Sequence, residues 1–246
     1  MNRICVLSDI HGNVVALEAV LRDIRQKGCD LLVVAGDLAA HGPSPVESVD
    51  LVRELDAVVL RGNTDRYLGQ AGAVASGNRS PEQIASLNWT REQLGDERLS
   101  YLYGLPPQAN FDGLLVVHGS PGDDEHGIWP WTPEEEILAD PWQGLLACGH
   151  THHPVQRMVA CGELVNVGSV GWPLDGDPRS SYAVLEFAGS GGRHSWQVTL
   201  RRVDYDRDRA LAELDRRQVP WRQTVRHYIE TAQWRSPLAA GRRAPK

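Results

Sequence analysis

Aspartate, asparagine and histidine side chains gather in five short clusters along this 246-residue sequence. Their oxygen and nitrogen atoms are ligands suited to manganese, iron, zinc or nickel, and none of the clusters contains a cysteine. In an extended segment, side chains two positions apart point the same way, so Asp9 and His11 share one face, as do His150 and His152. The chemistry that these residue types predict is that of a metal site. The clusters read Ser8-Asp9-Ile10-His11, Gly36-Asp37, Gly62-Asn63-Thr64-Asp65, His118-Gly119-Ser120 and Gly149-His150-Thr151-His152.

Each cluster follows a short apolar run, either directly or after one residue. Uninterrupted hydrophobicity of this length is typical of strands buried on both faces, as in a sheet covered by helices. In open α/β sheets, ligands bind outside the carboxyl ends of the strands, so we expect the five clusters to converge in one pocket. The runs are Ile4–Leu7, Leu31–Val34, Ala57–Leu60, Leu114–Val117 and Leu145–Cys148.

The remaining sequence predicts helices between these strands and a strand-rich second half. Leu17, Val20, Leu21 and Ile24 form one apolar helical stripe. Helix starts, each with an N-cap residue and a proline at the first helical position, are predicted at Ser44-Pro45, Ser80-Pro81 and Thr132-Pro133. Strands are predicted near 155–160, 163–167, 181–187 and 194–203, a hairpin turn at 189–192, and helices over 206–217 and from Pro220. This order predicts an α/β fold of two packed sheets with helices outside.

Composition and charge narrow the class of protein. With 41% hydrophobic residues, we expect a single domain over residues 1–235, with helices at 206–235 packed on it and a flexible tail at 236–246. The absence of a long apolar segment and of C-x-x-C spacing predicts a cytoplasmic protein with reduced thiols and no membrane contact.

The charges are unevenly distributed along the sequence. Residues 1–200 carry 13 Arg or Lys against 26 Asp or Glu, a balance that excludes stable nucleic-acid binding. Residues 201–246 carry 12 against 6, and we expect this basic part to pack on the acidic body.

Each cluster taken alone has a simpler explanation. Asp9 and His11 are compatible with an exposed loop, Gly36-Asp37 with a turn, and His118 with a buried structural histidine. Two histidines two positions apart after an apolar strand seldom serve a purely structural end. Five such clusters after five strands therefore favour a functional site.

The order of the clusters resembles the calcineurin-like metallophosphoesterase superfamily. Asp9–Asn13, His118–Pro121 and Asn166–Gly171 are similar to its small bacterial and archaeal phosphodiesterase branch, and the resemblance spans roughly residues 4 to 187. It implies a four-layer α/β/β/α sandwich of two mixed sheets flanked by helices. It also implies two divalent metal ions, which could be manganese, iron, zinc or nickel. The implied ligands are Asp37 as the bridge, Asp9, His11 and His152 for one ion, and Asn63, His118 and His150 for the other.

The resemblance implies hydrolysis of phosphodiester or nucleotide anhydride bonds by a hydroxide that bridges the two metals and attacks phosphorus in line. Many relatives have a histidine directly after the asparagine, where this sequence has Thr64. Asn63 and Thr64 are expected to bind substrate, and Asp65, His41 and His153 are candidates for the missing general acid. The alternatives are that Asp65 only orients Asn63, that His41 lines the pocket and that His153 faces solvent. Without a histidine acid, we expect leaving groups of low pKa to be preferred.

The expected partner is a small phosphorylated substrate, with a nucleotide as one candidate. Trp129, Trp131 and Trp142 flank an acidic loop, where a ring could stack on a nucleobase or simply pack in a hydrophobic cluster. Competing hypotheses are a phosphomonoesterase, including a protein Ser/Thr phosphatase, and a non-catalytic scaffold on the same fold. The complete set of seven implied ligands favours an enzyme. The oligomeric state stays open.

Overall fold

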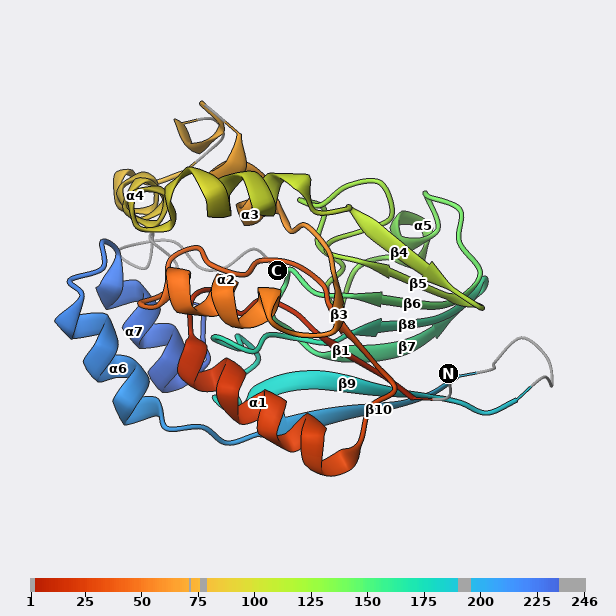
Figure 1. Ribbon diagram of the computed structural model, residues 1–246. Helices are drawn as coiled ribbons and strands as arrows, with labels where there is room; N and C mark the ends of the chain where they lie inside the picture. Colours follow the sequence, from red (N-terminus) through yellow and green to blue (C-terminus); the bar gives the residue numbers. More distant parts are fainter. Residues whose placement is uncertain (1–2, 71, 76–78, 190–195, 235–246) are drawn as a thin grey trace.

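The computed structural model describes residues 3–70, 72–75, 79–189 and 196–234. Two five-stranded sheets stack against each other (Figure 1), with the strand orders β10-β9-β1-β2-β3 and β4-β5-β6-β8-β7. In the first, β1, β2 and β3 are parallel, and β9 and β10 run antiparallel to their neighbours. In the second, β5, β6 and β8 are parallel, and β4 and β7 are antiparallel at the two edges. The predicted α/β sandwich of two mixed sheets is confirmed.

The strands are β1 (Arg3–Leu7), β2 (Leu31–Val34), β3 (Ala57–Val59), β4 (Gln108–Phe111), β5 (Leu114–Val117), β6 (Gly144–Cys148), β7 (Val155–Val159), β8 (Gly162–Asn166), β9 (Ser180–Phe187) and β10 (Trp196–Val203). The helices are α1 (Val14–Lys27), α2 (Pro45–Arg53), α3 (Asn63–Gly69), the 3-10 turn η1 (Ala73–Ala75), α4 (Pro81–Gly104), α5 (Glu134–Ile137), α6 (Arg207–Arg216) and α7 (Arg222–Thr231).

The five apolar runs form the strands that precede the chemical clusters, namely β1, β2, β3, β5 and β6. In Figure 1, β1 starts on the right and runs left, so its carboxyl end lies toward α6 and α7. The later strands β7 to β10 also lie where the sequence predicts them. The predicted hairpin turn at 189–192 and the predicted tail at 236–246 fall, apart from Gly189, outside the described residues.

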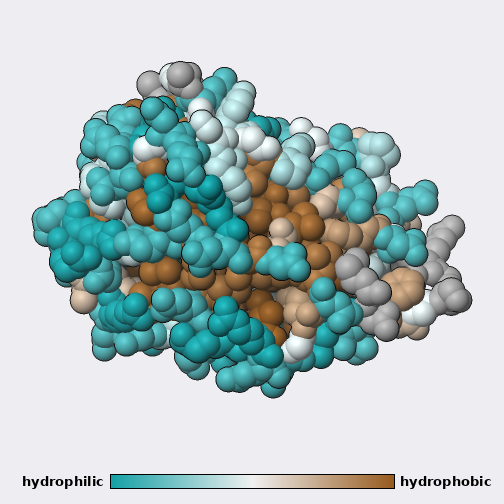
Figure 2. Space-filling view, viewed as in Figure 1, coloured by the Kyte–Doolittle hydropathy of each residue, from teal (hydrophilic) through white to brown (hydrophobic). Residues whose placement is uncertain are grey.

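The main hydrophobic core fills the space between the two sheets. Val6 and Val33 from the first sheet meet Val116 and Ala147 from the second, and all four are buried. A second core forms where α1, α2 and α4 cover the outer face of the first sheet. Burial on both faces explains why these strands are apolar throughout their length. In Figure 2, hydrophobic residues form a band across the middle of the visible face, between the hydrophilic surfaces of the helices.

The outer face of the second sheet has a thinner cover. Leu146 and Leu164 pack there against Trp142 and Ile137, which come from the connection between β5 and β6. This connection contains the short helix α5, which begins at Glu134, one residue after the proline that the sequence predicts as its first residue. By contrast, α2 and α4 begin at their predicted prolines, and Ser80 and Gln83 form the predicted capping box.

The C-terminal helices α6 and α7 pack against α1 and the loop after β8. Leu214, Val225 and Tyr228 form a core with Trp172 and Leu174 from that loop. Arginines of this part also pair with acids of the body, as in the contacts of Arg209 with Glu18 and of Arg217 with Glu47. Among the residues described here, no helix combines the length and the hydrophobicity needed to cross a membrane.

Candidate metal centre

The segments that follow β1, β2, β3, β5, β6 and β8 meet at one place, and their backbone there is unusual. In the described residues, nine non-glycine positions have positive φ, a conformation that costs non-glycine residues energy. Backbone outliers of this kind cluster at functional sites. Six of the nine are predicted site residues, namely Asp9, His11, Asp37, His41, His150 and His152.

One half of the site consists of Asp9, His11 and His152, all buried. The Nε2 atoms of the two imidazoles are 3.1 Å apart, and Asp9 Oδ1 is 3.2 Å from His152 Nε2. His11 Nδ1 donates to the carbonyl of Ala40 at 3.1 Å, and His152 Nδ1 donates to the carbonyl of Trp172 at 2.9 Å. With the Nδ1 proton held by a carbonyl, Nε2 is the atom that each ring turns toward the site and the one that can bind a metal.

The other half consists of Asn63, His118 and His150. Asn63 Oδ1 lies 2.9 Å from His118 Nε2 and 3.0 Å from His150 Nδ1. His118 Nδ1 donates to the carbonyl of Ala35 at 2.8 Å, which again turns Nε2 toward the site. Asn63 is the first residue of α3, and a Cβ at the preceding Gly62 would overlap the carboxylate of Asp37. Glycine at this position therefore allows α3 to begin against Asp37.

Asp37 lies between the two halves. Its Oδ2 is 3.5 Å from His11 Nε2, and its Oδ1 is 3.5 Å from His118 Nε2. The Oδ1 atom also accepts the backbone N–H of Thr64 at 3.0 Å. One carboxylate thus faces a histidine of each half with a different oxygen.

The donor atoms of this site fit divalent cations. Asp9 Oδ1 is buried without a hydrogen-bond partner, although His152 Nε2 lies only 3.2 Å away. Lone pairs of buried oxygen and nitrogen atoms that face one another repel unless a cation lies between them. Two groups of the described residues bring ligand atoms within 4.8 Å of one another, and Asp9 belongs to both: Asp9, His11 and His152, and Asp9, Asp37 and His118.

The electrostatics of the cluster favour the charged form of Asp9 and the neutral form of His150. Burial opposes ionisation of Asp9, but the imidazoles of His152 and His11 lower its pKa well below the usual range. Burial and the neighbouring His118 lower the pKa of His150 to about 4. For His118, the carboxylates of Asp37 and Asp9 outweigh the effect of burial and raise the pKa. The charged carboxylate of Asp9 and the neutral imidazole of His150 are in the states that bind metal ions, whereas a bound ion would have to displace a proton from His118.

Asp65 is completely buried behind the site. Its carboxylate accepts the backbone N–H groups of Gly62, Asp37 and Leu38 at 2.8 to 3.0 Å. Burial and the nearby Asp37 raise its pKa to about 7. Asp65 does not line the cavity in front of the site. This placement corresponds to the alternative in which Asp65 only orients Asn63, because Asp65 binds the N–H of Gly62, the residue before Asn63.

Thr64 and His41 line the cavity, and His153 lies elsewhere. Thr64 Oγ1 is buried and has no hydrogen-bond partner. His41 Nδ1 pairs with Ser86 Oγ at 3.0 Å, and burial, with His11 and Arg79, lowers its pKa to about 3. His153 Nδ1 instead donates to the carbonyl of Thr151, and its ring packs against Trp129 and Trp131.

The motif Asn166–Gly171 supports the ligand loops. Asn166 donates to the carbonyl of Gly149 at 2.6 Å and to Thr151 Oγ1 at 3.0 Å. The N–H of Gly171 and the hydroxyl of Ser169 both donate to the carbonyl of Asp9. These groups fix the loops that carry Asp9, His150 and His152, so they are not free to bind a phosphate.

A cavity of about 250 Å³ opens in front of the cluster, and much of its wall is aromatic. Sequence reasoning missed several lining residues: Tyr67, Arg79, Trp172, Trp221 and Trp234. Trp172 directly follows the Asn166–Gly171 motif, and this proximity was the available signal. Trp221 and Trp234 belong to the C-terminal part, for which no motif indicated a role. Of the tryptophans that flank the acidic loop, Trp129 lines the cavity, Trp142 packs in the core on the second sheet, and Trp131 is exposed.

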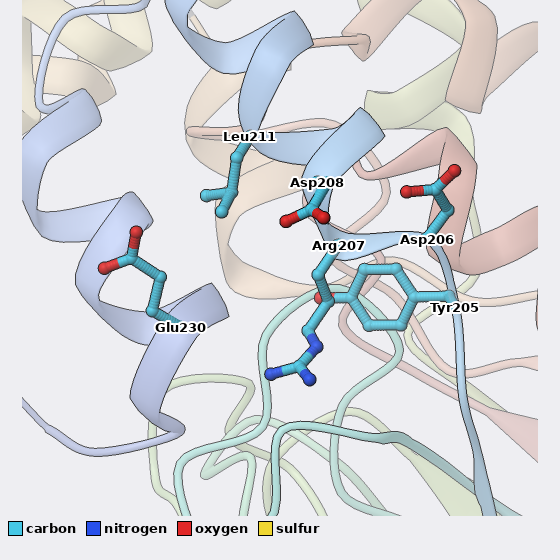
Figure 3. A pocket seen from close by; sticks show the side chains of 6 residues that line it. All are labelled: Tyr205, Asp206, Arg207, Asp208, Leu211 and Glu230. Carbon is cyan, nitrogen blue, oxygen red and sulfur yellow. The ribbon is translucent and has the colours of Figure 1, made fainter.

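A larger cavity of about 420 Å³ lies between the start of α6 and α7 (Figure 3). In Figure 3, Glu230 faces it from α7, and the other lining residues come from α6 and the segment before it. No histidine and no predicted site residue lines this cavity. Its described lining therefore lacks the combination of histidine and carboxylate ligands found in front of the cluster.

Comparisons with known proteins agree with this geometry. The model of the calcineurin-like phosphoesterase superfamily domain matches residues 2–190. A metallophosphoesterase of known structure from Sphaerobacter thermophilus is 30% identical, with coverage of 94% of this chain and 99% of that one and a TM-score of 0.74. Phosphodiesterase YfcE of Escherichia coli K12 is 28% identical over 76% of this chain and 88% of its own length. A symmetrical bis(5'-nucleosyl)-tetraphosphatase of Pectobacterium carotovorum is 32% identical, over only 48% of this chain and 42% of its own length. The chain belongs to the calcineurin-like phosphoesterase superfamily, hydrolases that act on phosphoric esters, and within it to the small bacterial and archaeal branch.

Proposed function

We propose that this protein hydrolyses phosphodiester or nucleotide anhydride bonds with a pair of divalent metal ions. The observation that carries the proposal is the placement of Asp37, whose two carboxylate oxygens face His11 in one half of the site and His118 in the other. A carboxylate shared in this way is suited to two neighbouring cations. The similarity to YfcE, which is named a phosphodiesterase, supports the choice of reaction.

In this proposal, Asp9, His11 and His152 hold one ion, Asn63, His118 and His150 hold the other, and Asp37 contacts both. Asp9 Oδ2 accepts the N–H of His150 at 2.9 Å, so Oδ1 is the oxygen left for a metal. This assigns Asp9 to the ion next to His152. The carbonyls of Ala40, Trp172 and Ala35 hold three of the imidazoles in the tautomer that binds metal.

When bound, the ions would supply an activated water and neutralise negative charge on the phosphoryl oxygens. The residues of the chain then bind and orient the substrate. Thr64 Oγ1 has no partner in the protein and lies at the cavity wall, where it can donate a hydrogen bond to a phosphoryl oxygen. Asp65 acts as a positioning residue, because its carboxylate ties together the N–H groups of Gly62, Asp37 and Leu38.

Apart from the proposed metal ligands, none of the described residues that line the cavity is a suitable general acid, and Asp65, whose pKa is raised to about 7, does not line it. His41 lines the cavity, but its pKa of about 3 leaves it without a proton to donate near neutral pH. We therefore expect esters with leaving groups of low pKa to be hydrolysed fastest. Aryl diesters and nucleotide anhydrides have such leaving groups. The partial similarity to a symmetrical bis(5'-nucleosyl)-tetraphosphatase supports a small nucleotide substrate.

Hydrolysis of bis- and mono-p-nitrophenyl phosphate tests the proposal. The protein is loaded with Mn²⁺, Ni²⁺, Zn²⁺ or Mg²⁺, and the wild type is compared with Asp37→Asn. We expect faster turnover of the diester and loss of activity in the variant. No activity with any metal would favour a scaffold role, faster turnover of the monoester would favour a phosphomonoesterase, and full activity of Asp37→Asn would refute the bridging role.

A further inference from the structure

The C-terminal helices contribute to the cavity although the superfamily domain does not include them. The family match ends at residue 190, whereas α6 and α7 span Arg207–Arg216 and Arg222–Thr231. Trp221, at the start of α7, and Trp234, shortly after its end, both line the cavity in front of the metal-binding cluster. One wall of the site thus comes from residues beyond the matched domain.

That wall contains a column of nearly parallel aromatic rings. Trp172 stacks on Tyr228 with ring centres 4.9 Å apart and planes 15° apart. Tyr228 stacks in turn against Trp234, at 5.8 Å and 22°. The inner end of the column touches the metal-binding cluster, because the Trp172 ring is 4.4 Å from that of His11 and 4.6 Å from that of His152.

The outer end of the column is open. Tyr228 is buried, whereas the Trp234 side chain is 59% exposed although it lines the cavity. One face of the Trp234 ring therefore packs on Tyr228 and the opposite face is available. A flat aromatic ring held on one side is the kind of surface on which nucleobases stack, since every base has a π-face.

With divalent ions bound, the charge of the same cavity would favour an anionic ligand. Arg79 lines it, with its guanidinium carbon 3.8 Å from the centre of the Tyr67 ring. Bound divalent ions would add further positive charge at the inner end. With these ions, the cavity would combine a cationic inner end with an aromatic rim, and this combination fits a ligand that joins phosphate to an aromatic ring.

We propose that Trp234 forms a nucleobase subsite, in which the base of a nucleotide stacks on the open face of the ring while the phosphate lies at the metal site. The inference rests on the proposed function and names its substrate class. The other aromatic pair near the cavity is less suited, because Trp131 stacks on Trp129 at 5.4 Å and covers it, and Trp131 itself does not line the cavity. Trp131, which is 69% exposed, is therefore a matched control.

Calorimetric titration in excess Mn²⁺ tests the subsite by binding alone. The ligand pairs are AMP with ribose 5-phosphate and ATP with tripolyphosphate, so the two members of each pair differ in whether they carry a base. We expect the nucleotide to bind about tenfold more tightly in at least one pair. Trp234→Ala should reduce this preference to within about twofold, Trp234→Phe should retain most of it, and Trp131→Ala should leave it unchanged.

Several outcomes would overturn the subsite: no preference for the base in the wild type, an unchanged preference in Trp234→Ala, or equal losses in Trp234→Ala and Trp131→Ala. Thermal unfolding of each variant shows whether a lost base preference is due to misfolding. If Trp234→Ala is misfolded, the base preference of Trp234→Phe decides whether an aromatic ring at this position binds the base. A wild type that hydrolyses bis-p-nitrophenyl phosphate but shows no base preference refutes the subsite alone. A wild type that prefers the base but hydrolyses no phosphoester refutes the proposed function and supports the subsite.

Discussion

The two halves of the site use similar ligands but have different support behind them. In the half with His11 and His152, the ring of Trp172 packs against both imidazoles, and Tyr228 of α7 packs behind Trp172. In the half with His118, the imidazole is held by the carbonyl of Ala35, directly after β2. The first half therefore depends on the C-terminal helices, and the second depends on the strand ends of the two sheets.

The two halves of one metal-binding cluster are therefore supported by different parts of the fold. The strand ends of the shared domain position all seven proposed ligands. Among the described residues, the helices beyond the matched domain pack behind the half with His11 and His152, where they contact Trp172 and Leu174. A substitution should therefore weaken metal binding in one half of the site and not in the other. Asp37 is the exception, because it faces both halves.

The largest effect is expected from Asp37→Asn. Loss of the shared charge should weaken metal binding in both halves and lower kcat/KM for bis-p-nitrophenyl phosphate on the order of 10³-fold. Metal content by mass spectrometry and steady-state kinetics measure the two effects. The exposed Asp140→Asn serves as the control and should match the wild type. If Asp37→Asn loses metal from one half only, the symmetric placement of Asp37 does not reflect a shared role.

Trp172→Leu should separate the two halves. Removing the ring that packs on His11 and His152 should weaken the first metal site about 10- to 100-fold and leave the second site unchanged. Titration with Mn²⁺, fitted to two sites, measures both affinities. Trp142→Leu is the control, because Trp142 is also buried but packs on the outer face of the second sheet, so both variants should lose about 3 kcal/mol of stability. Equal weakening of both metal sites by Trp172→Leu would show that Trp172 does not support the half with His11 and His152 alone.

A pH-dependent effect on stability is expected from His41, which lies beside the first half. Its pKa of about 3 in the folded protein is below the value of about 6.5 for an unfolded chain. The unfolded state therefore binds more protons between these values, and stability falls as the pH drops from 6.5 toward 3. At pH 5 this loss amounts to about 2 kcal/mol, which His41→Asn should remove.

Urea unfolding of the metal-free protein at pH 7.5 and pH 5.0 measures this contribution. The difference in stability between the two pH values should be smaller in His41→Asn than in the wild type. The exposed His126→Asn should show the wild-type difference. An identical pH dependence in all three proteins would show that His41 does not remain neutral in the fold.

The smallest effect is expected from Thr64→His in the second half. A histidine there could protonate a leaving oxygen. It should therefore raise the turnover of an alkyl monoester relative to that of an aryl monoester by about tenfold. The ratio of kcat/KM for methyl phosphate and p-nitrophenyl phosphate measures this change, and Thr64→Gln controls for the larger side chain. A constant ratio in all variants would show that proton donation does not limit the reaction.

Much of the fold was predictable because its strands are buried on both faces. Exposing runs such as Leu31–Val34 to water would cost free energy, so their hydrophobicity identifies them directly as buried strands. The edge strand β4, Gln108–Phe111, was missed because it is partly exposed and has no such run. Helix α3 was missed for a different reason, since its first residues, Asn63-Thr64-Asp65, have the composition of a turn.

The sequence by itself determined the chemistry of this protein: strands that end in Asp, Asn and His, and hence a cluster of metal-binding side chains at one edge of two sheets. Only the tertiary structure decided what surrounds that cluster. Asp65 turned out to hold backbone N–H groups behind the site, and Trp172, Tyr228 and Trp234 turned out to form one column of rings. The physical reason is that strand ends are marked by local hydrophobic patterns, whereas packing between residues 172 and 234 depends on how distant segments meet.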